Sequence, residues 1–243
     1  MYRERPSTIA GATLWRSDGG GSTVILPDGC IDVLWWNGRL VVAGPDERAH
    51  ASESDPESLT LGIRFAPGTA PGLLGLPAHA LTNERVELSE LWERATVQRI
   101  DAELRGSGSP TTARRFEELV AGELRTPEAR RARQARELAA SVARGLSVSD
   151  IALRTGYSER QLHRRSREDF GYGLSTLARV LRLQRALPGL GSTATLAEVA
   201  ATAGYADQAH LSREVRSLSG FTPTQLRAAK SSTELPSGSR TIA

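Results

Sequence analysis

The sequence predicts an α+β protein with a β-rich N-terminal domain and an all-α C-terminal domain. Three observations carry this prediction: short apolar runs between turn residues over the first hundred positions, helical periodicity without strand signals from about Pro127 onward, and a duplicated helical segment. The expected parts are a small barrel with a following helix (1–105), a linker with a short helix (106–129), a helical domain (130–230) and a disordered tail (231–243).

The first domain contains several short strand candidates. These are residues 23–26, 31–36, 40–43 and 59–65, and turns rich in Pro, Gly and Asp separate them. Asn37-Gly38 predicts a two-residue hairpin, because both positions of such a turn favour positive φ. Strands at this spacing are typical of a small barrel or sandwich.

Two helices are expected after these strands. The first has one apolar face, which we interpret as core packing rather than a dimer seam: Leu88, Leu91, Trp92, Ala95, Ile100 and Leu104. The segment Gly106 to Pro110 (GSGSP) predicts a flexible break. The second helix stops before Pro127, and its apolar residues are Phe116, Leu119, Val120 and Leu124.

Charge divides the chain in the same way. Residues 1–126 hold 13 Arg against 18 acids, a net charge of −5, whereas residues 127–230 hold 17 basic residues against 9 acids, a net charge of +8. This asymmetry predicts an electrostatic partner for the second half only. No apolar run is long enough to cross a bilayer, no signal peptide begins the chain, and one cysteine forms no intrachain disulfide. We therefore expect a cytoplasmic protein with no membrane partner.

A near-repeat dominates the second half. Residues 147–157 align with residues 195–205 at an offset of 48. Each copy opens with a capping box, continues with a β-branched residue followed by Ala, and ends four residues later in Gly. This order is typical of a helix-turn-helix, because the Ala permits a close helix crossing and the Gly supplies a left-handed turn. The residues are Ser147, Asp150, Ile151, Ala152 and Gly156 in one copy, and Thr195, Glu198, Val199, Ala200 and Gly204 in the other.

A further helix is predicted after each Gly-Tyr pair. Ser158 and Gln161 form another capping box, and Asp207 can cap the counterpart. The later matches, Leu162 with Leu211 and Gly171 with Gly220, are offset by 49, so the second copy has one extra residue near its turn. The two units span about 146–171 and 194–220.

The second helix of each unit has a polar outer face. In the major groove Arg pairs with guanine and Gln with adenine, so these faces predict contacts to double-stranded DNA. The alternative is that each face is charged and only solvated. The duplication and the net charge of +8 favour DNA binding over this alternative. The candidate DNA-binding residues are Arg160, His163, Arg164 and Arg167, and Gln208, Ser212, Arg213 and Arg216.

The region from about Arg136 to Lys230 resembles the DNA-binding domain of AraC/XylS-type transcriptional regulators. The motifs are IAxxxGYS (151–158), RL followed by QRA (182–186) and GFTPTQLR (220–227). The resemblance implies two helix-turn-helix units, joined by a helix over about 174–187, that enter successive major grooves on one DNA face. It places Arg160, His163 and Arg164, and Gln208, Ser212 and Arg213, closest to the bases.

The chain departs from this family at four positions. Ser166 and Val215 stand where the family usually has Phe, which predicts looser packing beneath each second helix. Pro188 and Gly189 predict a shortened linking helix. Mutation of Gly156, Gly204, Ala152 or Ala200 is expected to affect the fold rather than the specificity.

The N-terminal segment 26–34, followed by Gly44-Pro45, resembles an uncharacterised domain found before AraC-type DNA-binding domains. The resemblance implies a cupin-like module for effector sensing or dimerisation. The residues themselves make Cys30, Trp35 and Trp36 candidate pocket or sensor residues. A structural apolar role for Cys30 and surface positions for His50 and His79 are the favoured interpretations.

The whole sequence predicts a sequence-specific transcriptional regulator that responds to a small-molecule effector and acts at the nucleoid. RNA polymerase and a second copy of the chain are further candidate partners. No enzyme motif, metal cluster or cofactor fingerprint is present, so no enzymatic activity, metal or cofactor is expected. Two alternatives stay open: a redox- or alkylation-sensing regulator that uses Cys30, and a protein-interaction module that controls another regulator.

Overall fold

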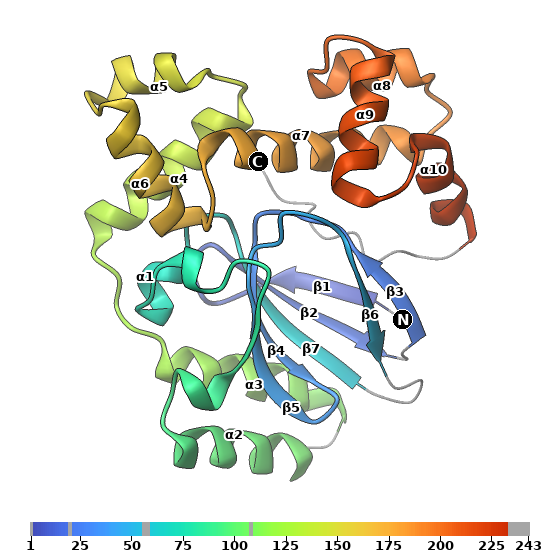
Figure 1. The fold of residues 1–243 in the computed structure, drawn as a ribbon. Coiled ribbons are helices and arrows are strands. Elements are labelled where there is room, and N and C mark those ends of the chain that lie inside the picture. The colour runs from blue at the N-terminus through green and yellow to red at the C-terminus, as the bar shows by residue number, and fades with distance from the viewer. Residues whose placement is uncertain (1, 19–20, 55–58, 107–108, 233–243) are drawn as a thin grey trace.

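The computed structural model describes residues 2–18, 21–54, 59–106 and 109–232. Strands fill the first part and helices the second, as predicted (Figure 1). The strands are β1 (Tyr2–Pro6), β2 (Ala12–Asp18), β3 (Gly21–Ile25), β4 (Ile31–Trp36), β5 (Arg39–Ala43), β6 (His50–Ser54), β7 (Leu59–Phe65) and β8 (Arg85–Glu87).

The helices follow the last long strand. Near the sheet lie α1 (Ala70–Leu74), the 3-10 turns η1 (Ala78–Ala80) and η2 (Leu88–Glu90), α2 (Arg94–Gly106) and α3 (Ser109–Glu123). The C-terminal helices are α4 (Ala129–Ala143), α5 (Val148–Thr155), α6 (Glu159–Phe170), α7 (Leu174–Leu190), α8 (Leu196–Ala203), α9 (Gln208–Ser219) and α10 (Pro223–Ser232).

The strands form two antiparallel sheets. Six of them pair in the order β1-β2-β7-β4-β5-β8, and β3 pairs with β6. The predicted hairpin joins β4 to β5, with φ of 49° at Asn37 and 69° at Gly38. No apolar pattern predicted β1, β6 or β8, because these short strands are mostly polar and are held by backbone pairing to β2, β3 and β5.

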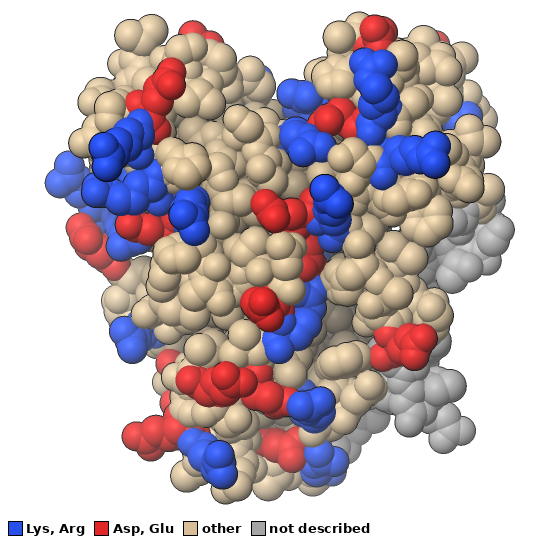
Figure 2. Space-filling view, in the orientation of Figure 1, with Lys and Arg blue, Asp and Glu red and all other residues tan. Residues whose placement is uncertain are grey.

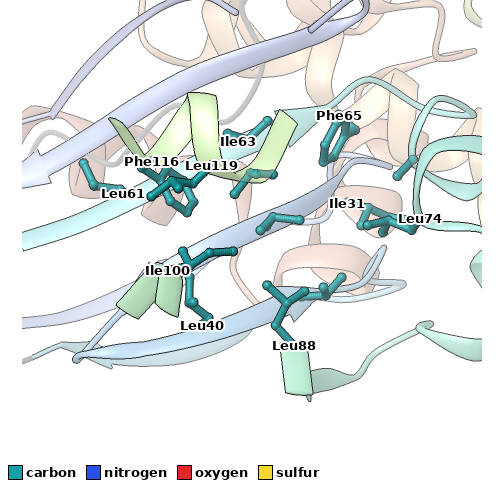
Figure 3. Packing of buried hydrophobic residues seen from close by; sticks show 14 of the residues in the cluster. Ile31, Leu40, Leu61, Ile63, Phe65, Leu74, Leu88, Ile100, Phe116 and Leu119 are labelled. Atoms are coloured by element: carbon teal, nitrogen blue, oxygen red, sulfur yellow. The ribbon is translucent and has the colours of Figure 1, made fainter. Parts of the chain in front are cut away.

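One face of the six-stranded sheet carries the core of the N-terminal part. Alternate residues of β4 and β7 point to this face and pack against α2 and α3 (Figure 3). The buried residues include Ile31, Val33, Leu61, Ile63, Phe65, Ile100, Phe116 and Leu119. The short helix predicted for the linker is therefore α3, and it shares a core with the sheet.

Two predicted boundaries need correction. The helix expected from Leu88 begins at Arg94, since Leu88 lies in a separate 3-10 turn and is buried there. The helix α10 runs through Ser232, into the predicted tail, and residues 233–243 lie outside the described part. Of the predicted GSGSP break, residues 107–108 also lie outside it.

Two further cores lie in the helical region, and α7 contributes to both. Leu177 and Leu181 of α7 belong to a core with α4, α5 and α6, whereas Leu183 and Leu190 belong to a core with α8, α9 and α10. Figure 1 shows α7 running between the two helical groups. Among the described residues, no helix is both long and apolar enough to cross a membrane.

The helix α7 continues past its proline, contrary to the prediction that Pro188 and Gly189 shorten it. Pro188 lies in the last turn of the helix. A Cβ at Gly189 would lie 2.9 Å from Val199, so the glycine lets α8 approach closely. Burial of Leu190 at this crossing stabilises the final turn.

Candidate nucleic-acid interface

The first helix-turn-helix unit consists of α5 and α6. The Ser147 hydroxyl accepts from the Asp150 N–H at 3.1 Å, and the Asp150 carboxylate accepts from the Ser147 N–H at 3.3 Å. Hydrogen bonds from the side chain and then from the backbone of Ser147 lower the pKa of Asp150. Gly156 ends α5 with φ of 71°, and a second capping box at Ser158 starts α6. The predicted caps of this unit are confirmed.

The second unit, α8 and α9, repeats this construction. The Thr195 hydroxyl accepts from the Glu198 N–H at 3.2 Å, Gly204 has φ of 84°, and Asp207 accepts from the His210 N–H at 2.6 Å. Hydrogen bonds from the backbone and then from the side chain of Thr195 lower the pKa of Glu198. The extra residue of this copy lies between Gly204 and the cap of α9. The two second helices α6 and α9 are therefore the candidate recognition helices.

The structure brings the four candidates of α6 together on one exposed face. They are Arg160, His163, Arg164 and Arg167. The opposite face is buried, and Leu162 is fully enclosed. Ser166, where looser packing was predicted, is also fully buried, and its hydroxyl donates to the Tyr172 carbonyl at 2.6 Å. This bond gives the polar side chain a partner beneath α6.

The candidates of α9 are less uniform. Gln208, Arg213 and Arg216 are exposed. Ser212 is half-buried, and its hydroxyl donates to the Gln208 carbonyl at 2.9 Å, so its donor is used within the helix. Val215, the second position of predicted looser packing, is fully buried in the core.

Some arginines of the helical region contact other side chains of the protein and differ in this from the arginines on the exposed faces of α6 and α9. Arg165 stacks over the Tyr157 ring at 4.7 Å and donates to Gln134 at 2.8 Å. Arg179 of α7 pairs with Glu214 at 2.8 Å. Basic side chains also gather on the surface over α6 and α9 (Figure 2). Within the described part of the chain, Arg160, Arg164, Arg167, Arg213 and Arg216 have no ion pair.

Sequence reasoning missed one residue next to α6. His79 of η1 lines a cavity of about 250 Å³ together with residues of the recognition helix. The other lining residues are Arg160, His163, Arg164, Arg167 and Glu168. His79 lies about eighty positions before α6 and in another sequence region, so no local pattern could place it there.

None of the three candidate sensor residues lines the cavity beside α6 or the larger cavity described below. Cys30 is 7% exposed, and its backbone N–H donates to Asp28 at 2.8 Å. Trp35 packs against the N-terminal core and donates to Asp101 at 3.0 Å, and Trp36 is half-buried. The described residues contain no group of three or more His, Cys, Asp or Glu that could hold a metal ion.

A larger cavity, of about 540 Å³, lies elsewhere in the N-terminal part and is lined mainly by charged and polar residues. Its lining residues are Asp46, Glu47, Arg48, Ala49, His50, Asn83 and Arg85. Arg85 donates to both oxygens of Asp46, at 3.1 and 2.7 Å. Burial and then the Arg85 charge lower the pKa of His50. These residues, from loops and from the first positions of β6 and β8, form no motif in the sequence.

Two family matches cover separate parts of the chain. The family described as a helix-turn-helix domain matches residues 154–229, and a domain of unknown function (DUF6597) matches residues 12–87. No protein of curated function matches the chain.

Several solved structures are similar to this chain at low identity. A probable AraC family transcriptional regulator from Rhodopseudomonas palustris is 23% identical, over 39% of this chain and 90% of that one, with a TM-score of 0.34. The C-terminal domain of AraT from Geobacillus stearothermophilus is 21% identical, over 39% and 83%, with a TM-score of 0.37. Apo ToxT from Vibrio cholerae is 10% identical, over 92% and 99%, with a TM-score of 0.46.

The tandem capped units and the match over residues 154–229 agree with the predicted resemblance. The matched N-terminal region is a separate domain. The chain carries an AraC-type helix-turn-helix domain behind an N-terminal domain of unknown function, and the helix-turn-helix domain supports a role as a DNA-binding transcription regulator.

Proposed function

We propose that this regulator recognises one specific DNA sequence by inserting α6 and α9 into successive major grooves on one side of a duplex. The observation that carries this proposal is the pair of recognition helices, each capped by the side chain at its N-terminus and each exposing arginines that have no ion pair among the described residues. Arg164 and Arg213 are proposed to contact guanine edges, and Gln208 an adenine edge. The remaining candidates are proposed to contact phosphates or neighbouring bases.

Selection from a randomised duplex pool with the full chain tests this proposal. We expect an asymmetric motif with two half-elements about one helical turn apart, because the two units are unlike in their exposed residues. Selection with Arg213→Ala should then lose information in one half-element only. Enrichment of no motif, with binding that falls steeply as salt rises, would contradict sequence-specific recognition by this chain.

We further propose that the N-terminal domain responds to a small polar molecule held in the cavity of about 540 Å³. The mixed charges of its lining suit a polar ligand. The Ala49 N–H at its edge donates to the Leu218 carbonyl of α9 at 2.7 Å, so a change in this loop reaches the second recognition helix. Arg48 is exposed, so its removal should affect the fold least, and we choose it as the candidate ligand contact.

Thermal unfolding in the presence of organic acids, amino acids, sugars and phosphorylated metabolites tests the effector proposal. At a concentration about 100 times its Kd, a ligand should raise Tm by about 5–10 °C. The rise should shrink in Arg48→Ala and persist in Arg114→Ala, which removes an exposed arginine of α3. Stabilisation that is equal in both variants would place the ligand elsewhere.

Burial of Cys30 favours its structural role over redox or alkylation sensing.

We propose that the protein acts at the nucleoid in the cytoplasm, where double-stranded DNA is its main partner. Contacts with RNA polymerase and with a second copy of the chain are further proposals of the same kind.

A further inference from the structure

The cavity beside α6 joins two parts of the chain that are far apart in sequence. Five of its lining residues follow one another along one face of α6, at helical spacings of three and four. The sixth, His79, belongs to η1 in the N-terminal part. The N-terminal domain therefore presents a side chain beside the proposed DNA-reading face.

Close packing fixes η1 at this place. The Thr82 hydroxyl donates to the Gly171 carbonyl at 3.2 Å, at the C-terminal end of α6. A Cβ at Gly68 would lie 2.8 Å from the Phe170 ring, so the backbone before η1 also approaches α6 closely. These contacts flank His79 in sequence, and its position relative to α6 follows from them.

The turn η1 lies beside the reading face of α6 and does not cover it. Arg160, His163, Arg164 and Arg167 all remain exposed in the full chain, and so does His79. A DNA duplex that reaches α6 therefore meets His79 at the margin of the same surface.

The charge of this cavity suits an anion. Besides Arg164, which is assigned to a guanine edge, Arg160 and Arg167 line it, and neither has an ion pair within the described residues. The only acid in the lining, Glu168, already pairs with Arg131 at 3.2 Å. A neutral imidazole still carries one N–H donor, so His79 and His163 can each donate to an oxyanion. Guanidinium and imidazole donors around a small cavity are the groups that bind phosphate.

We propose that this cavity binds a phosphate group of the DNA backbone, and that the N-terminal domain thereby forms part of the DNA interface through His79. The proposal rests on the proposed reading of DNA by α6. It adds a contact outside the helix-turn-helix domain, next to the groove that α6 enters. A free phosphorylated molecule carries the same chemistry and is the competing source of the phosphate.

The test compares full-chain His79→Ala, His79→Gln and His79→Glu for affinity to the selected duplex. Loss of one hydrogen bond to a charged oxygen predicts about tenfold weaker binding for His79→Ala. His79→Gln, which keeps an N–H donor, should bind within about threefold of wild type. His79→Glu should bind more weakly than His79→Ala because its carboxylate repels phosphate. Arg114→Ala, on exposed α3, is the matched control and should bind as wild type does.

A duplex with a neutral methylphosphonate linkage at each backbone position beside the α6 half-element identifies the contacted phosphate. At one position the neutral linkage should weaken binding of the wild-type protein about tenfold. The same linkage should weaken binding of His79→Ala very little, because that variant already lacks the contact to this phosphate. If inorganic phosphate raises Tm while every linkage and every His79 variant leaves DNA affinity unchanged, the cavity serves a free ligand and the DNA assignment is overturned.

Arg164→Ala separates the failure of this inference from the failure of the proposed function. If Arg164→Ala weakens binding while the His79 variants bind as wild type does, His79 lies outside the interface. If Arg164→Ala has no effect either, reading of DNA by α6 itself is refuted.

Discussion

Arg164→Ala and Arg213→Ala are each expected to weaken binding to the selected duplex by about 1–3 kcal/mol, roughly 5- to 150-fold. Each guanidinium lies on the exposed face of a recognition helix and has no ion pair among the described residues. Such a group can donate two hydrogen bonds to one guanine, and its removal leaves the base edge unpaired. Because the two residues lie on different units, the double variant should lose the sum of the two single losses.

The measurement is a fluorescence-anisotropy titration on the selected and on a scrambled duplex at one salt concentration. Arg133→Ala is the matched control, since it removes an exposed arginine from α4, outside both reading faces. Losses confined to the selected duplex support base contacts. Equal losses on both duplexes would assign Arg164 and Arg213 to phosphates instead.

Gly171→Ala is expected to destabilise the protein by about 1–3 kcal/mol more than Gly220→Ala. The two glycines are equivalent in the repeat and end α6 and α9 with φ of 88° and 77°. Both substitutions therefore share a left-handed strain of about 1–2 kcal/mol. At Gly171 the new Cβ would lie 2.4 Å from the Thr82 hydroxyl and 2.8 Å from the Pro45 ring. At Gly220 no neighbour among the described residues lies within 4 Å.

Urea unfolding of both variants, followed by circular dichroism, measures this difference. The excess loss at Gly171 reports the contact between α6 and the N-terminal domain, because the backbone strain cancels in the comparison. Equal losses in the two variants would mean that Thr82 and Pro45 shift at no cost. The proposed role of η1 in placing His79 would then lose its support.

The sequence predicted the helical domain well because its signals are local. Capping boxes at Ser147 and Thr195, and left-handed glycines such as Gly156, depend only on residues three to five positions apart. The Asn37-Gly38 hairpin was predictable for the same reason. Duplication then made each local pattern more informative than it is alone.

The missed features depend on contacts that are distant in sequence. The strand β1 is polar and is defined by its pairing with β2, which no periodicity records. The last turn of α7 persists beyond Pro188 because Leu190 is buried against α8 and α9. His79 lies in η1, and the lining of the larger cavity comes from loops and from the ends of β6 and β8, whose positions follow from tertiary packing. Local propensity carries no information on such placements.

The division of α7 between two cores limits how this regulator can be altered by evolution or by engineering. Leu177 completes the interior of one unit and Leu190 that of the other, on one continuous helix. Cutting the domain between its repeats would leave each half with an open hydrophobic interior. Neither repeat is thus a transferable module. New target sequences are reached by exchanging the exposed residues of α6 or α9, while the buried residues of both cores stay unchanged.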